Sequence, residues 1–194
     1  NCTMIPPTTV TTARSLDLQR SEFSARRFLA MPLAGTTAWI VVGVSGMLLP
    51  SRTVGIILFV ATGMIAYLGM FISRFTGENF LDKTKPKNTF DALFFYTVAM
   101  SLLAYALAIP FYLVDHTSLP LTVGILTGMM WLPFSWIVQH WVGVFHSVVR
   151  TLLIVVLWYA FPQQRFVVIP FAIVAVYAFT IAIFEQRWRR NHSA

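Results

Sequence analysis

Six long apolar segments constrain the fold of this chain more than any other feature of its sequence. They cover residues 28–49, 53–73, 90–114, 119–138, 141–161 and 166–184. Each is close to the roughly 20 residues that a helix needs to cross the hydrocarbon core of a bilayer. Only 11% of the residues are charged, whereas a soluble domain carries roughly 25%. The sequence therefore predicts an all-α, polytopic transmembrane helix bundle with six spans.

Short polar breaks, most of which contain proline or glycine, separate the six segments. The break at Gln139–His140 is the shortest, so its flanking residues must supply part of the turn. Pro110, Pro133 and Pro170 lie inside or close to spans. We expect them to kink helices, because proline lacks a backbone N–H.

Most of the positive charge falls on one side of the predicted bundle. Eleven of the 14 Lys and Arg residues lie in the N-terminal tail, in the 74–89 loop and at the C-terminus, which share one side if six segments span the membrane. The loops of the other side carry Arg52 and Arg165. The positive-inside rule then predicts that both termini are cytoplasmic. Because this asymmetry accounts for the net charge of +7, no nucleic-acid partner is needed to explain it.

The chain divides into two predicted tails and one membrane domain. Residues 1–27 form a cytoplasmic N-terminal tail, 28–186 the six-helix domain, and 187–194 a cytoplasmic C-terminal tail. Two interpretations stay open for residues 15–27, a short interfacial helix or a disordered segment. The lone cysteine, Cys2, excludes an internal disulfide and a cysteine-based metal cluster.

One charged side chain, Arg150, lies inside an apolar span. It follows Trp141 by nine residues, which is about 13–14 Å along a helix and therefore near the midplane. A central arginine costs roughly 2.5 to 3.5 kcal/mol on insertion scales, so the lipid-facing orientation is disfavoured. His146 and Gly143 share its helix face. We therefore expect these three residues to face the interior of the bundle.

Polar residues of the second and third spans are the expected neighbours of Arg150. In the third span Asp91, Ser101 and Tyr105 fall on one helical stripe, with Ser101 near the depth of Arg150. In the second span Tyr67 lies at roughly the depth of His146. No carboxylate falls at the midplane, so hydroxyls, backbone carbonyls, water or an anionic ligand must hold the guanidinium. The candidate ligand-binding residues are Arg150, His146, Tyr67, Ser101, Tyr105 and Asp91.

The sequence points to no catalytic residue, no metal site and no cofactor. The signatures of zinc peptidases, redox cysteine pairs, phosphate-binding loops and serine hydrolases do not occur in it. A haem held by two histidines would need partners at matching depth, and His146 is the histidine that lies within a span. An enzyme is the less favoured class, because it would have to use His146 or His140 as its acid–base group.

The stretch WLPFSWIVQHWVGVFHSVVRTLLIVVLWYAFPQQRFVVIP, residues 131–170, resembles a family of bacterial inner-membrane proteins with six spans and unknown function. The resemblance extends over about residues 28–186. It implies a multi-pass protein of the bacterial inner (plasma) membrane, surrounded by membrane lipid. It implies no particular activity and no catalytic residue.

Two functional classes follow from these observations. The first is a small transporter, channel or ligand-binding membrane protein, whose site around Arg150 and His146 takes a small anion or a lipid headgroup. Six spans are few for a carrier, so this class is expected to form a homodimer. The second is an accessory or scaffold membrane protein, in which the buried polar residues only fix helix packing. A water-accessible cavity that reaches Arg150 would favour the first class.

Overall fold

The structure is a computed structural model that describes residues 14–80, 82, 84 and 86–192. Helices make up most of this part of the chain, and no β-strand occurs in it. The all-α prediction is therefore confirmed over the described ranges. Cys2, Lys83 and Lys85, on which the disulfide and charge predictions draw, lie outside the described residues.

Long apolar helices, each able to cross a membrane, form the body of the protein. Within the described residues five stretches meet this criterion. A sixth does so if α3 (Ser51–Gly63) and α4 (Ile65–Ser73), which are bent by 43° at Met64, count as one span. The other spans are α2 (Ala30–Leu48), α5 with α6 (Thr89–Leu103 and Tyr105–Val114), the 3-10 turn η1 with α7 and α8 (His116–Ser118, Leu119–Gly128 and Trp131–Val138), α9 (Val142–Ala160) and α10 (Arg165–His192).

The span that contains α7 and α8 is interrupted at Met129–Met130, and Pro133 explains the interruption. Proline has no N–H to donate to the carbonyl four residues earlier, which is that of Met129. The N–H of Leu132 bonds this carbonyl instead, at 3.1 Å. The predicted proline effect is therefore seen in this span, whereas Pro110 and Pro170 lie inside the continuous helices α6 and α10.

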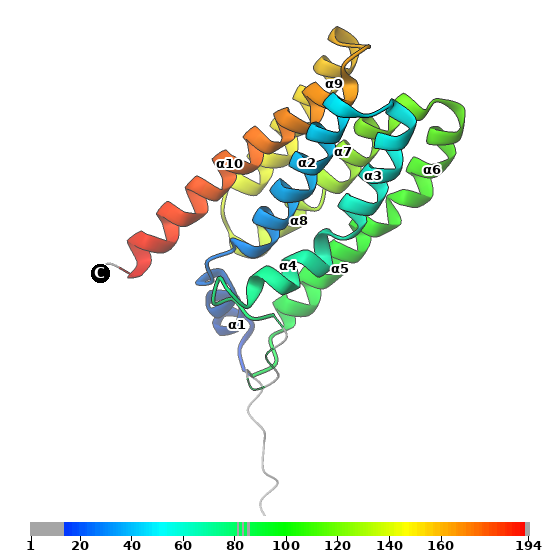
Figure 1. The fold of residues 1–194 in the computed structure, drawn as a ribbon. Coiled ribbons are helices and arrows are strands. Elements are labelled where there is room, and N and C mark those ends of the chain that lie inside the picture. The colour runs from blue at the N-terminus through cyan, green and yellow to red at the C-terminus, as the bar shows by residue number, and fades with distance from the viewer. Residues whose placement is uncertain (1–13, 81, 83, 85, 193–194) are drawn as a thin grey trace, which may run out of the picture.

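The connections between spans alternate between two ends of the bundle (Figure 1). One end carries α1 (Leu16–Ser24), the 74–88 loop, the turn at 139–141 and the C-terminal part of α10; we call it the basic end. The opposite end carries the turn before α3, η1 and the turn before α10. Arg165 lies at this opposite end, where it donates to the hydroxyl of Thr117 at 2.6 Å. The alternation is the one that six spans require.

Helix α1 lies across the basic end rather than continuing a span (Figure 1). Ser15 caps its N-terminus, accepting from the N–H of Leu18 at 3.3 Å. Phe23 anchors the helix, with its ring 5.2 Å from that of Phe28 and 6.2 Å from that of Phe94. Leu16 is 62% exposed. Phe23 of α1 therefore enters the bundle, while Leu16 faces outward.

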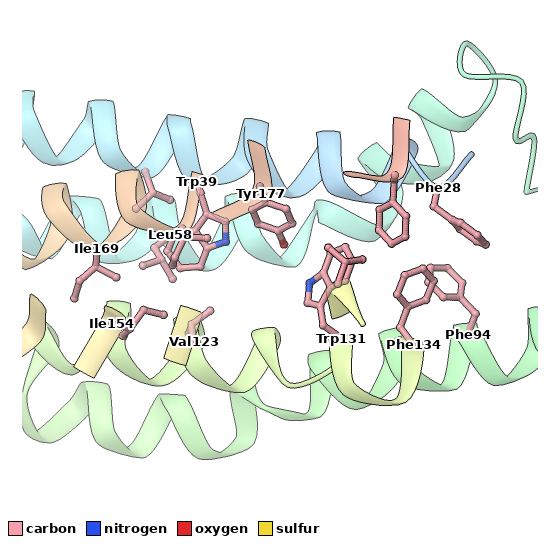
Figure 2. Close-up of a cluster of buried hydrophobic side chains, with 14 of the residues drawn as sticks. Phe28, Trp39, Leu58, Phe94, Val123, Trp131, Phe134, Ile154, Ile169 and Tyr177 are labelled. Carbon is pink, nitrogen blue, oxygen red and sulfur yellow. The ribbon is translucent and has the colours of Figure 1, made fainter. Parts of the chain in front are cut away.

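Large aromatic and branched side chains fill the interior along its length. Figure 2 shows two groups, one around Trp39 and Leu58 toward the opposite end and one of phenylalanines toward the basic end, with Trp131 between them. Glycine allows close approach beside this core: a Cβ on Gly35 would lie 2.5 Å from the phenol of Tyr177. A Cβ on Gly143 would lie 2.6 Å from the carbonyl oxygen of Trp131, so α8 and α9 are in backbone contact there.

Candidate functional site

Arg150 lies near the middle of α9 and is 1% exposed. Its Nη2 donates to the hydroxyl of Thr127 on α7 at 3.0 Å. Its Nη1 donates to the hydroxyl of Tyr177 on α10 at 3.4 Å and lies 3.5 Å from Nε2 of His146. The indole of Trp39 adds a cation–π contact, with Cζ 5.4 Å from the ring centroid. The predicted inward orientation of Arg150 and His146 is confirmed.

His146 links the arginine to α8 and α10. It is fully buried, its ring stacks on Trp131 at 4.2 Å, and its Nδ1 lies 2.9 Å from the hydroxyl of Thr180. The Thr180 hydroxyl donates to the carbonyl of Val176 at 2.8 Å. Because the Thr180 proton is used there, its oxygen accepts from Nδ1–H of His146. The imidazole therefore turns an unprotonated Nε2 toward Arg150.

Arg150 has no acidic partner among the described residues. The ion pairs of this part of the chain join Arg14 to Glu22, Arg26 to Asp91, and both Arg27 and Arg189 to Glu185. They gather at the basic end, far along the bundle from the middle of α9. The Nε of Arg150 also has no hydrogen-bond partner among the described residues. A buried charge without a counter-charge carries a desolvation cost of several kcal/mol, which an anion would offset.

A cavity with about 50 Å³ of space for water molecules adjoins this group; we call it the central cavity. This is room for about one or two waters. Thr127 and Tyr177, which bond the guanidinium, are part of its wall, so Arg150 stands directly behind the lining. The interrupted spans also meet here, because Ile65, Tyr105 and Trp131 follow breaks in the helices and line the cavity.

Two residues of the cavity wall carry hydrogen-bond donors that lack acceptors among the described residues. The indole N–H of Trp131 is one of them. Tyr177 accepts from Arg150, and its own O–H has no acceptor in the described part of the chain. The neighbouring hydroxyl of Ser101 is already used, since it donates to the carbonyl of Thr97 at 3.2 Å. Unpaired donors and a cation therefore lie in or behind the wall of the cavity, and no acidic side chain is among the described residues that line it.

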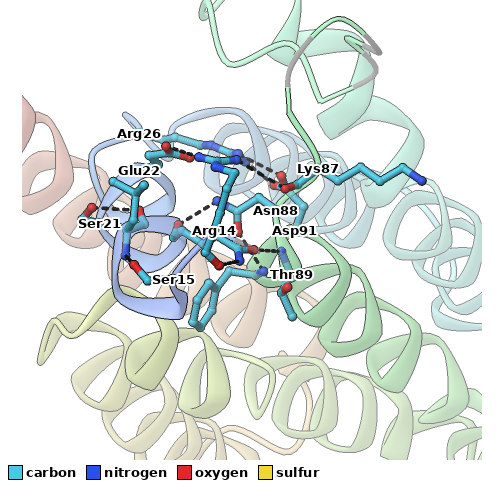
Figure 3. Close-up of polar contacts among 12 residues, drawn as sticks. Arg14, Ser15, Ser21, Glu22, Arg26, Lys87, Asn88, Thr89 and Asp91 are labelled. Atoms are coloured by element: carbon cyan, nitrogen blue, oxygen red, sulfur yellow. Dashed lines mark hydrogen bonds and ion pairs between the residues drawn. The ribbon is translucent and has the colours of Figure 1, made fainter. Parts of the chain in front are cut away.

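The remaining predicted site residues divide into two groups. Ser101 and Tyr105 line the central cavity but do not bond Arg150; Tyr105 pairs with the hydroxyl of Thr62. Tyr67 is 63% exposed on α4. Asp91 lies at the basic end, where a carboxylate oxygen accepts from Nη2 of Arg26 at 2.9 Å (Figure 3). The structure therefore brings Ser101 and Tyr105 to the Arg150 region and separates Tyr67 and Asp91 from it.

The expectation that hydroxyls of the second and third spans hold Arg150 was wrong. The hydroxyls come from Thr127 on the fourth span and Tyr177 on the sixth. Residue depth can be counted from a span end, but the counting does not give the rotation of one helix against another. One signal in the sequence could have helped: Tyr177 and Thr180 are polar residues three apart in an otherwise apolar segment.

A second buried polar group lies at the basic end. Glu78 is 6% exposed, and its Oε1 accepts from the backbone N–H groups of Leu29 at 2.7 Å and Ala30 at 2.9 Å. It thereby binds the first N–H groups of α2. Burial raises the pKa of this carboxyl above its ordinary value, although the two N–H bonds act in the other direction. Arg27 pairs with Glu185 next to it, through two contacts of 2.8 Å.

A profile described as Family of unknown function (DUF7010) matches residues 17–186. The matched region begins in α1 and ends within α10, so it contains every residue of the central cavity. Neither a curated protein nor a solved structure matches the chain. The comparisons therefore give a family without an activity.

Proposed function

The chain belongs to this family of unknown function, and we propose that it is a membrane protein that binds a small anion in the central cavity. The observation that carries the proposal is a buried guanidinium without a carboxylate partner among the described residues, standing behind the wall of a cavity. An acceptor-only ligand would use the O–H of Tyr177. The charge of Arg150 would attract it strongly, because bulk water is excluded there.

The setting favours transport or channel activity over simple storage of an anion. Three spans are interrupted where they meet the cavity, at Met64, Ala104 and Met129–Met130. Discontinuous helices around a mid-membrane site are typical of secondary transporters. We place the protein in the bacterial inner membrane, with the basic end in the cytoplasm, because the positive charges of the loops gather there. A carrier of this size would work as a homodimer.

One observation favours a second candidate, an accessory or scaffold protein. The guanidinium already has two hydroxyls and an imidazole as partners, and it is 1% exposed. In that case the network would fix the relative rotation of α7, α9 and α10, and the cavity would hold only water. The free donors of Tyr177 and Trp131 are what this alternative leaves unexplained.

The test is the melting temperature of the purified protein in detergent, measured with chloride, acetate and phosphate in turn. We expect at least one anion to stabilise the wild type, because a ligand that binds only the folded state raises its stability. Tyr177→Phe should weaken this stabilisation, since it removes a donor of the cavity. Tyr159→Phe is the matched control, because Tyr159 is 74% exposed on α9. Equal responses of all three proteins would contradict anion binding in the cavity and favour the scaffold.

A further inference from the structure

A second hollow lies next to the central cavity, toward the basic end; we call it the phenylalanine pocket. It is lined by Phe23, Phe28, Phe80, Phe94 and Phe134. It has about 20 Å³ of space for water molecules, which is about one water. An apolar hollow of this kind stays dry and takes apolar groups instead. The pocket therefore suits a small hydrocarbon group rather than solvent.

The two hollows are contiguous. Met31, Met130 and Trp131 line both of them, so they form the wall that the hollows share. Figure 2 shows Trp131 between Tyr177 on one side and Phe134 with Phe94 on the other. The Trp131 ring lies 6.0 Å from that of Tyr177 and 5.4 Å from that of Phe134. Two methionines in this wall make it adaptable, because their unbranched side chains change rotamer easily.

From this adjacency we infer the class of ligand: an organic anion with a short apolar chain. The inference rests on the proposed function, since it takes the anion site as given. The charged group would lie in the central cavity beside Tyr177, in front of Arg150, and the chain would pass Trp131 into the phenylalanine pocket. The small volumes limit the length of the ligand's apolar chain, because the two hollows together have room for only a few waters. A complete lipid tail does not fit.

One acidic side chain, Glu78, is among the described residues that line the phenylalanine pocket, and it does not oppose this assignment. Its Oε1 is turned to the N–H groups of Leu29 and Ala30, at the start of α2. The charged group of the ligand would be at the other end of the path, beyond Trp131. A carboxylate at one end of the path and a cation behind the other end would orient an anionic ligand with its chain toward Glu78.

The experiment measures equilibrium binding of labelled acetate, butyrate, hexanoate and octanoate to the purified full chain in detergent. We expect affinity to rise about fourfold for each methylene that enters the pocket. It should reach a maximum at about two to four carbons and then fall, because the hollows are small. A steady rise to octanoate would instead indicate a chain that extends into detergent or lipid, and it would overturn the assignment.

Variants of the phenylalanine pocket distinguish binding in the pocket from partitioning of the carboxylate chain into detergent. Phe94→Trp should move the maximum to shorter chains by filling the pocket, while Phe134→Leu should move it to longer chains by enlarging it. Phe95→Trp is the matched control, since Phe95 is 38% exposed next to Phe94. If Phe94→Trp does not fold, Phe134→Leu still decides the question.

The outcomes separate the two proposals. A maximum that moves as described supports the ligand class. Carboxylates that all bind equally, or a maximum that neither variant moves, overturn the ligand class while the anion site stands. If no carboxylate binds, and chloride and phosphate also have no effect on melting, both proposals fail.

Discussion

Nη1 of Arg150 lies 3.5 Å from Nε2 of His146, one turn earlier on the same face of α9. Arg150 is the donor in this contact, because the Nδ1–H of the imidazole donates to Thr180 and Nε2 is left unprotonated. Arginine has no acceptor, so the imidazole nitrogen that faces it must be the acceptor. His146 thus accepts a hydrogen bond from the guanidinium, but it does not compensate the positive charge.

The first prediction concerns this tautomer. We expect the ¹⁵N shifts of His146 to show a protonated Nδ1 and an unprotonated Nε2. Thr180→Val should destabilise the protein by about 1–3 kcal/mol, because it leaves the buried Nδ1–H without an acceptor. Thr37→Val is a suitable control, since Thr37 is exposed and bonds within its own helix, to the carbonyl of Leu33. A spectrum with the proton on Nε2 would contradict the assigned network.

The second prediction concerns the contact between α8 and α9. Gly143→Ala should destabilise the protein by about 1–3 kcal/mol, because overpacking forces backbone shifts. The new Cβ would meet the carbonyl oxygen of Trp131 at 2.6 Å, and a backbone atom cannot rotate away. Gly63→Ala is the control, since nothing lies within 4 Å of its Cβ position. Thermal unfolding in detergent measures both, and equal melting temperatures would refute the close approach.

Much of the fold could be predicted from the sequence, because the membrane requirement acts on each segment separately. Each predicted span contains helix, and the positions of the turns agree with the polar breaks. The bend at Met64 was not predicted, since no proline or charged residue marks it. The sixth helix is also longer than its apolar segment: α10 continues to His192, where its charged residues pair at the basic end.

The site was predicted only in part, for a physical reason. Arg150 and His146 could be recognised because a charge inside an apolar span is costly wherever the helix packs. Their partners depend on the rotation and neighbours of other helices, which apolar spans specify weakly. Thr127 was missed for this reason, although Gly128 beside it allows the guanidinium to approach: a Cβ there would lie 3.0 Å from Cδ and Nε of Arg150.

The third prediction concerns orientation in the membrane. In a Cys2→Ser background, a single cysteine at position 52 should react with an impermeant maleimide applied to intact cells. A cysteine at position 190 should react only after permeabilisation. Both native arginines are exposed, so access is limited by the membrane and not by packing. The reverse pattern would show that the basic end is outside, against the positive-inside rule.

The fourth prediction concerns pH and Glu78. Burial raises the pKa of this carboxyl in the folded protein above the unfolded value. The folded state therefore binds the proton more tightly, and stability from this group is present at low pH and lost as pH rises through the folded pKa. Glu78→Gln keeps an acceptor for the N–H groups of Leu29 and Ala30 but cannot ionise.

We therefore expect the melting temperature of Glu78→Gln, relative to the wild type, to increase as pH is raised from about 4.5 toward neutral. The difference between the two proteins is the relevant quantity, because other carboxyls titrate in both. Glu22→Gln is the control, since Glu22 is an exposed residue of α1. A difference that stays constant over this range, or that falls with pH, would show that the Glu78 carboxyl is not held in an unfavourable environment.

The last prediction separates the two candidate functions at Arg150. Without an anion, Arg150→Leu should fold and melt at or above the temperature of the wild type, because a packed apolar group often replaces a buried charge at no loss. With an anion, the wild type should gain stability and the Leu variant should not. Arg150→Lys keeps the charge but cannot bond Thr127 and Tyr177 with one planar group, so its affinity should fall about 10-fold to 100-fold. A Leu variant that matches the wild type in stability and in its response to each anion would eliminate the site, and the scaffold function would then be preferred.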